Sequence, residues 1–299
     1  MGSWKLRDYV ETIQLSVSFT RTYYLSIFLA ILGVFVITVS LFLSILFIGS
    51  ILLSFVYGPF DDMFDVFESI GLALDRASDV EAVGIALFAG SALLAPFLTA
   101  LGALFGMGQE VMESGSISAE EVLLWYRQKF ARLAAGGMVQ FLIIVGPIGM
   151  EYILAAWYYG DRMPDSSAFT ILVATAVAWF LFSSGILSLV FPSIVDGMSI
   201  SSSTKHSIQL TRHNFRAVFS IWITFSSLGL LLLGPIIFQE FTDFIFLTGA
   251  AYDLYIVASV LVIGLLLLPV YVLSATRTYL IISDPNIKEV QESHTKEST

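Results

Sequence analysis

The sequence predicts an all-α integral membrane protein in which six helices cross the membrane as a bundle. Three observations support this fold class: 57% of the 299 residues are hydrophobic, only 13% are charged, and six long stretches are almost entirely apolar. Soluble domains carry about 25% charged and roughly 45–50% apolar residues, so a water-soluble enzyme is excluded. Cysteine is absent, which excludes disulfides, thiolate metal sites and cysteine nucleophiles.

Each apolar stretch has the roughly 20 residues that a helix needs to cross a bilayer. The first stretch would be about 50 Å long at a rise of about 1.5 Å per residue, which is too short for two crossings, so we expect one tilted helix. It is also much longer than the apolar core of a cleavable signal peptide, and we expect it to stay as an anchor. The predicted spans are residues 24–56, 83–107, 133–158, 168–191, 217–238 and 254–275.

The orientation follows from the basic residues in the connections between spans. Twelve Lys and Arg residues lie on the side of the N-terminus, whereas the other side holds only Arg76 and Arg162. Basic residues are retained in the cytoplasm, so a multi-pass protein of the cell membrane with both termini in the cytoplasm is predicted. Residues 1–283 are expected to form one membrane domain, followed by a polar, disordered tail at 284–299.

The net charge of −10 belongs mainly to the predicted outer side and argues against nucleic acid as a partner. The first outer connection, residues 58–81, carries seven acidic residues beside aromatic residues at helical spacing. This pattern predicts an amphipathic helix on the outer membrane surface. Asp161 and Asp165 add two acids to the second outer connection.

Amphipathic helices are also predicted on the cytoplasmic side, before the third and fifth spans. Ser118-x-x-Glu121 is a capping box that opens one of them, and Ser201 to Thr204 supply capping hydroxyls for the other. Basic side chains beside aromatic ones favour contact with anionic lipid headgroups. The candidate lipid contacts are Arg127, Lys129, Arg132, Arg212 and Arg216.

These cytoplasmic segments resemble one another in sequence. Arg127-Gln-Lys-Phe130 aligns with Arg212-His-Asn-Phe215 at an offset of 85 residues, and Ile13-Gln14-Leu15 matches Ile208-Gln209-Leu210. We therefore predict a three-fold internal repeat, in which each unit is an amphipathic helix followed by two spans. The alternative is that any basic amphipathic helix before a span has this appearance.

Four of the six predicted spans contain a proline, and a fifth proline, Pro192, directly follows the fourth span. Proline removes a backbone donor and bends a helix, and transporter folds use such positions as binding sites, although better packing is the commoner reason. The predicted bends are at Pro96, Pro147, Pro192, Pro235 and Pro269.

Known catalytic arrangements are not supported by the sequence. Ser183-Ser184-Gly185 lies where a rhomboid-type protease would have its serine, but such a serine needs a histidine, and the three histidines lie outside the spans. Glu120-Glu121 lacks the arginine and histidines of the prenyl-protein-type proteases, and a capping box explains it. The histidines are His206, His213 and His294.

Charged side chains inside a membrane usually mark transport pathways, but none is expected at the centre of a span. Glu151 and Asp253 fall near the outer ends of their spans, and Asp196 falls at the cytoplasmic end after Pro192. A carrier with a carboxylate relay is therefore disfavoured. A site lined by hydroxyls stays open as an alternative, through Thr99, Thr175, Ser183, Thr224 and Ser226.

Several motifs together resemble a broad family of uncharacterised six-helix membrane proteins with archaeal members. The family is similar to the membrane domain fused to some glycerophosphodiester phosphodiesterases, but this chain has no phosphodiesterase domain, so no catalytic residue is carried over. Acidic loops, with five Lys against nine Arg, also resemble haloarchaeal proteins. The matching motifs, spread over roughly residues 5–283, are Pro96, Ser118-x-x-Glu121, Arg127-x-x-Phe130, Arg132-Leu, Pro192…Asp196-Gly197 and Ser207-x-x-Leu210-x-Arg212-x-Asn214-Phe215.

The expected function is that of a non-catalytic membrane scaffold or partner protein with a role in lipid handling, without cofactor or metal. Its expected partners are membrane lipids and other membrane proteins or a second copy of the chain, and no nucleic acid. The alternative is a channel or carrier for a small solute or lipid that uses bent helices around Pro147 and Pro235.

Overall fold

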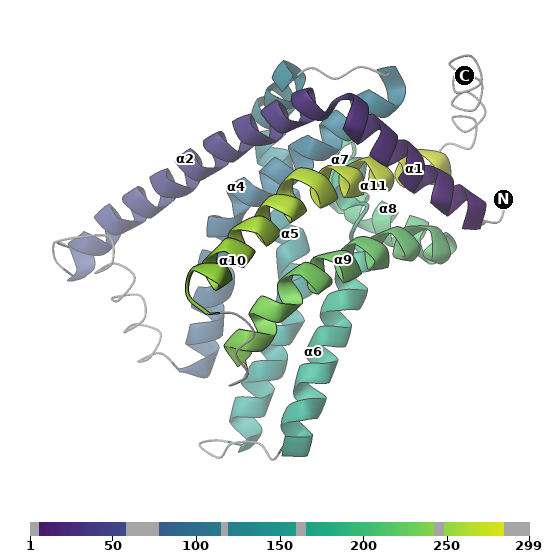
Figure 1. The fold of residues 1–299 in the computed structure, drawn as a ribbon. Helices are drawn as coiled ribbons and strands as arrows, with labels where there is room; N and C mark the ends of the chain where they lie inside the picture. Colours follow the sequence, from purple (N-terminus) through teal and green to yellow (C-terminus); the bar gives the residue numbers. More distant parts are fainter. Residues whose placement is uncertain (1–5, 58–77, 115–118, 160–165, 242–247, 284–299) are drawn as a thin grey trace. The chain divides into compact units, whose positions relative to one another are not determined.

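The structure is a computed structural model that describes residues 6–57, 78–114, 119–159, 166–241 and 248–283 (Figure 1). All regular elements in these ranges are helices, and six stretches are long and apolar enough to cross a membrane. The predicted class, an all-α protein with six candidate spans, is therefore confirmed. Residues 58–77 of the predicted outer helix, Asp161, Asp165 and the predicted tail at 284–299 lie outside the described residues.

The six stretches agree with the predicted spans, and each contains most of one of them. They are Tyr24–Leu52, Val80–Glu113, Leu124–Tyr159, Ser167–Val195, Phe215–Ile236 and Ala250–Ser283. The helices that form them and their connections are α1 (Leu6–Thr22), α2 (Tyr24–Tyr57), α4 (Asp79–Ser114), α5 (Ala119–Tyr159), α6 (Ser166–Ile186), α7 (Val190–Val195), α8 (Ile200–His213), α9 (Phe215–Phe241), α10 (Ala250–Val262), the π-helical turn η1 (Ile263–Leu267) and α11 (Leu268–Ser283).

The fourth predicted span is interrupted, because α6 ends at Ile186 and α7 begins at Val190. Proline has no N–H and its ring clashes with the carbonyl four residues earlier, which for Pro192 is that of Ser188. The backbone tightens just before this point, since the N–H of Val190 bonds to the carbonyl of Leu187 at 3.1 Å, one residue closer than in an α-helix. The physical cause is the same proline that the sequence marks as a bend.

The sixth stretch has a different irregularity. The π-helical turn η1 directly precedes α11, whose second residue is Pro269. In a regular helix, Pro269 would have to donate to the carbonyl of Leu265, which lies inside this turn, so the wider turn falls where the missing donor disturbs the helix. The other three prolines lie inside helices that continue through them: Pro96 in α4, Pro147 in α5 and Pro235 in α9.

The segments that precede the first, third and fifth spans are also helical, but they join their spans in different ways. A single turn at Tyr23 separates α1 from α2, and Asn214 separates α8 from α9. In contrast, α5 runs without interruption from Ala119 to Tyr159, so the predicted amphipathic segment and the third span form one helix of 41 residues. Neither glycine nor proline lies between them to end the first segment.

The helices form two compact units. The first unit comprises Met1–Gly33, Gly102–Lys129 and Gly185–Thr299, and the second comprises Val34–Leu101 and Phe130–Ser184. In the first unit, α1 lies beside α11, so helices from opposite ends of the sequence are neighbours (Figure 1). The core of the first unit includes a buried cluster of Leu189, Val218, Tyr279 and Leu280.

The second unit packs the remaining parts of α2, α4, α5 and α6 by close approach of small residues and by aromatic contacts. At Gly137 in α5, an added Cβ would lie 2.5 Å from the Cβ of Leu98 in α4. The indole N–H of Trp179 in α6 donates to the carbonyl of Ile144 in α5 at 3.0 Å. Small residues that let backbones approach are a common means of association between membrane helices.

The contact at Gly137 provides a test of this packing. We expect Gly137→Ala to lower the free energy of unfolding by about 1–3 kcal/mol, the usual cost of overpacking, because its methyl group would overlap the side chain of Leu98. Thermal unfolding of the detergent-solubilised protein measures the effect. Gly84→Ala in α4 is the matched control, since a Cβ at Gly84 meets no atom within 4 Å. Equal melting temperatures for the two variants would contradict the contact.

Candidate functional site

The first helix, α1, turns a row of hydroxyl groups toward the protein. Each of these side chains donates to the carbonyl four residues earlier in α1, at 2.8–2.9 Å. Since their hydroxyls are satisfied within the helix, this face can be buried against other helices without unpaired polar groups. Apolar side chains lie on other parts of α1, with Val10 42% and Val17 48% exposed. The buried hydroxyl residues are Thr12, Ser16 and Thr20.

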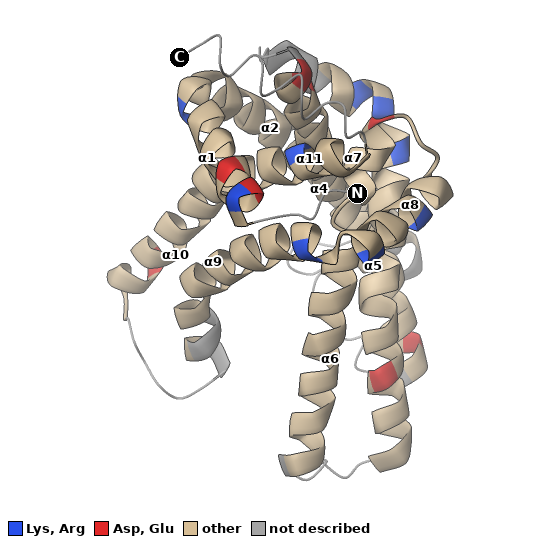
Figure 2. Cartoon of the chain, turned by 90° about the vertical axis from the view of Figure 1, so that its right-hand side faces the viewer, with Lys and Arg blue, Asp and Glu red and all other residues tan. Residues whose placement is uncertain are grey.

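An ion pair between a buried arginine and a partly exposed glutamate holds α1 against α11. Arg277 in α11 is only 3% exposed, and its Nη2 donates to Oε1 of Glu11 at 2.8 Å. Its Nη1 donates to the hydroxyl of Thr12 at 3.3 Å, while Nε has no hydrogen-bond partner among the described residues. A charge buried this deeply is costly unless it is paired, so α1 must lie where Glu11 can reach it. Figure 2 shows acidic and basic residues together where α1 and α11 meet.

The helix α8 lies against the interrupted fourth span. The hydroxyl of Ser207 donates to the carbonyl of Ile186 at 2.7 Å, and that of Thr211 reaches the same oxygen at 3.3 Å. In a regular helix this carbonyl would accept from Val190, which instead bonds to Leu187. The hydroxyls of α8 therefore satisfy an acceptor that the break in the helix leaves unpaired.

A second polar contact joins the end of α7 to α11. The hydroxyl of Tyr279 donates to Oδ2 of Asp196 at 2.8 Å, and the ring of His206 lies edge-on to Tyr279 at 6.2 Å between centroids. Gly197, next to Asp196, has φ of +97°, a conformation that a residue with a side chain rarely adopts. Asp196 therefore ends the α7 segment and ties it to the last helix.

The start of α5 lies against the end of α4. The indole of Trp125 lies over Gly106, where an added Cβ would be 2.9 Å from the ring, and its N–H donates to Oε2 of Glu110 at 3.2 Å. The ammonium group of Lys129 lies 4.2 Å from the centroid of the Trp125 ring and donates to the carbonyl of Val195 at 2.5 Å. Lys129 is therefore engaged inside the first unit.

The other predicted lipid contacts differ from Lys129. All four are exposed, and none forms an ion pair with another residue that the structure describes. On the α8–α9 connection, basic residues mark the start of α9 (Figure 2). These four exposed side chains are Arg127, Arg132, Arg212 and Arg216.

Three of the five hydroxyl residues that were predicted to line a site form hydrogen bonds within their own helices. Thr99 donates to the carbonyl of Ala95 at 2.8 Å, and Ser183 donates to that of Trp179 at 2.7 Å. Thr175 donates to the carbonyls of its own helix at 2.9 Å and also contacts the carboxylate of Glu151. Such bonds to the preceding turn are typical of hydroxyls in membrane helices and need no ligand.

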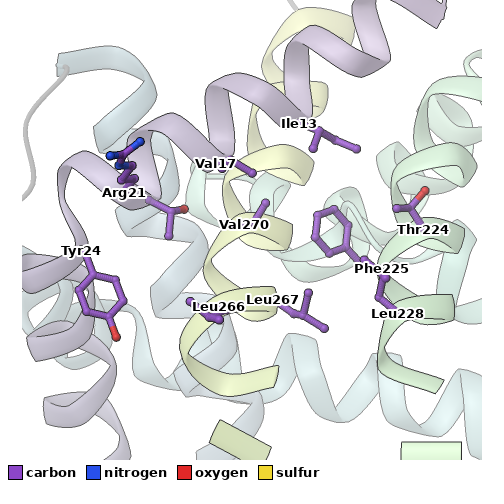
Figure 3. A pocket seen from close by; sticks show the side chains of 11 residues that line it. Ile13, Val17, Arg21, Tyr24, Thr224, Phe225, Leu228, Leu266, Leu267 and Val270 are labelled. Atoms are coloured by element: carbon purple, nitrogen blue, oxygen red, sulfur yellow. The ribbon is translucent and has the colours of Figure 1, made fainter. Parts of the chain in front are cut away.

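The remaining two hydroxyl residues of that prediction, Thr224 and Ser226, line neighbouring cavities along α9. The larger cavity, about 660 Å³, has walls from α1, the start of α2, α9 and the η1–α11 segment (Figure 3). Sequence reasoning did not find it, because its walls come from segments far apart in the chain. Its lining residues are Ile13, Val17, Thr20, Arg21, Tyr24, Thr224, Phe225, Leu228, Leu266, Leu267 and Val270.

The described residues contain no group of three or more His, Asp or Glu side chains placed to hold a metal ion. The side chains of Glu120 and Glu121 and the residue Ser118 lie outside the described part of the structure. Comparisons with models of protein families, with curated proteins and with solved structures give no match.

The ion pair between α1 and α11 gives a direct prediction. We expect Glu11→Gln to destabilise the protein toward the lower end of the about 3–5 kcal/mol that breaking a buried pair costs, because Arg277 would keep an uncompensated buried charge while the Glu11 side chain is 35% exposed. The double variant Glu11→Gln with Arg277→Met should lose less stability than the sum of the two single changes. Denaturant unfolding in detergent measures both effects. Strict additivity would contradict the coupling.

Proposed function

We propose that this protein is a non-catalytic integral membrane protein that acts as a scaffold or partner protein in lipid handling. The observation that carries the proposal is the set of exposed arginines at the ends of apolar helices. Arg212 and Arg216 flank the start of the span Phe215–Ile236, and Arg127 lies at the start of Leu124–Tyr159. Exposed guanidinium groups that form no ion pair within the described part of the chain are suited to anionic lipid headgroups.

The same arginines support the proposed orientation. Basic residues near the ends of spans are retained in the cytoplasm, so we infer that both termini are cytoplasmic and that the protein resides in the cell membrane. The arginines around the starts of α5 and α9 then face the inner leaflet, which carries anionic lipids.

We also infer the three-fold repeat, and the packing of the first unit supports it. Thr12 and Ser16 of α1 correspond to Ser207 and Thr211 of α8 at one offset of 195 residues, and all four are buried. The helix α1 lies against α11, α8 lies against α7, and the start of α5 lies against α4. In each case a helix that precedes a pair of spans contacts the last helix of another pair.

The resemblance to the six-helix membrane family is part of the same proposal. Its motif residues have structural tasks: Pro192 interrupts a span, Gly197 adopts a positive φ, and the side chain of Asn214 donates to the carbonyl of Leu210 between α8 and α9. Motifs with these tasks define a topology more than a reaction. The hydroxyls of Ser183 and its neighbour in α6 donate to their own helix, which agrees with a non-catalytic protein.

The alternative function, a channel or carrier, depends on bends around Pro147 and Pro235. Both prolines lie inside helices that continue through them. The interruptions occur instead at residues 187–189 and in η1. The described helices therefore favour the scaffold over a carrier built on these two prolines.

The lipid preference of the exposed arginines can be measured. We expect phosphatidylglycerol to raise the melting temperature of the micellar protein more than phosphatidylcholine does. Replacing Arg212 and Arg216 together by Gln should weaken the binding of phosphatidylglycerol about tenfold to thirtyfold, because each basic residue near a membrane surface contributes about 1 kcal/mol. The effect should shrink as the salt concentration rises.

The charge-preserving variant, with Lys at both positions, is the control and should retain most of the preference. Equal stabilisation by the two lipids in the unmodified protein would contradict the proposal. Hydrolysis of a lipid by the purified protein, abolished by a single substitution, would contradict its non-catalytic part.

A further inference from the structure

We propose that the 660 Å³ cavity between α1, α9 and the η1–α11 segment is a binding site for an anionic phospholipid of the bilayer, with an acyl chain in the cavity and the phosphate at Arg21. This inference rests on the proposed role in lipid handling and adds to it a defined site, separate from the arginines at the starts of α5 and α9. The cavity lies within the range of about 300–1,000 Å³ that is typical of ligand sites.

The chemistry of the walls favours a hydrocarbon chain over a polar solute. Phe225, Leu267 and Val270 form the middle of the wall (Figure 3). The hydroxyl of Thr20 already donates within α1, and that of Thr224 donates to Ser220 and shares a 2.7 Å hydrogen bond with Tyr9. Because these hydroxyls already form hydrogen bonds within the protein, the wall has few groups that could bind a polar molecule.

The only charged residue among the described residues that line the cavity indicates which lipid headgroup binds there. Arg21 lies in the last turn of α1, is exposed, and forms no ion pair with another described residue. Figure 3 shows its guanidinium group at one end of the cavity, directed away from Leu266 and Leu267. A guanidinium group binds a phosphate through two parallel hydrogen bonds, whereas a zwitterionic headgroup would also bring a cation to the same place.

The backbone around the cavity gives an independent reason to regard the cavity as a binding site. Leu266 and Leu267 belong to the π-helical turn η1, and single π-helical turns inside longer helices occur frequently at functional sites. On the opposite wall, the ion pair of Glu11 with Arg277 fixes α1, which contributes Val17 and Arg21. The cavity therefore lies between a helix held in place and a helix that is locally widened.

The test measures retained lipid by native mass spectrometry of the full chain in micelles doped with phosphatidylglycerol or phosphatidylcholine of identical acyl chains. We expect one phosphatidylglycerol per chain and much less phosphatidylcholine. Arg21→Gln should weaken the retention of phosphatidylglycerol about tenfold, through the loss of a hydrogen-bonded charge pair, and Arg21→Lys should restore part of it.

Filling the cavity should remove the lipid without a change in charge. Val17→Trp places an indole in the cavity and should abolish retention, whereas Val10→Trp, at an exposed position of the same helix outside the cavity, should not. If Val17→Trp fails to fold, Leu228→Trp makes the same test from α9. Retention that is unchanged in Arg21→Gln and in the filled variants would overturn the proposal.

The outcome separates this site from the proposed function. Loss of the anionic preference on replacing Arg212 and Arg216, with no effect of Arg21→Gln or of the filled variants, would leave the surface role intact and reject the cavity. The absence of any anionic preference in the unmodified protein would reject both. Loss of a retained lipid only in the Arg21 and filled variants would support the cavity alone.

Discussion

The first unit depends on one interaction, the ion pair of the buried Arg277 with Glu11. A guanidinium group that is 3% exposed cannot be left without a counter-charge, so this arginine determines where α1 lies. The hydroxyl row on the same face of α1 makes the approach possible, because its side chains are short and already bonded. With α1 fixed in this way, its remaining side chains can form one wall of the large cavity.

The second constraint is that backbone carbonyls near the prolines must find hydrogen-bond donors outside their own helix. A membrane offers no water to a carbonyl that has lost its helical partner, so another part of the chain must supply a donor. Ser207 and Thr211 of α8 do so for Ile186. Polar residues in α8 thus serve the interior of the protein, while arginines on and after the same helix stay exposed. One short helix thus combines a face bonded to the interior with an exposed basic side chain.

The fold class and the six spans could be predicted because apolar stretches of sufficient length admit few other structures. The irregular positions could not, since five prolines look alike in sequence, yet only Pro192 and Pro269 accompany a break or a π-helical turn. Whether a proline does so depends on donors from distant helices. The same limit applies to Lys129, predicted as a lipid contact, whose partners Trp125 and Val195 depend on the fold. The cavity is lined by segments more than 200 residues apart, so no short stretch of the sequence indicates it.

The pairing of α1 with α11 also has a consequence for the order of assembly in the cell. Glu11 leaves the ribosome 266 residues before Arg277 does. All intervening helices are therefore synthesised before the partner of α1 exists. Contacts of such long sequence separation form late and slowly. During this interval α1 lacks the partner that buries its hydroxyl face. The cavity is therefore completed only when the last helix is in place, and a chain stalled earlier would lack one of its walls.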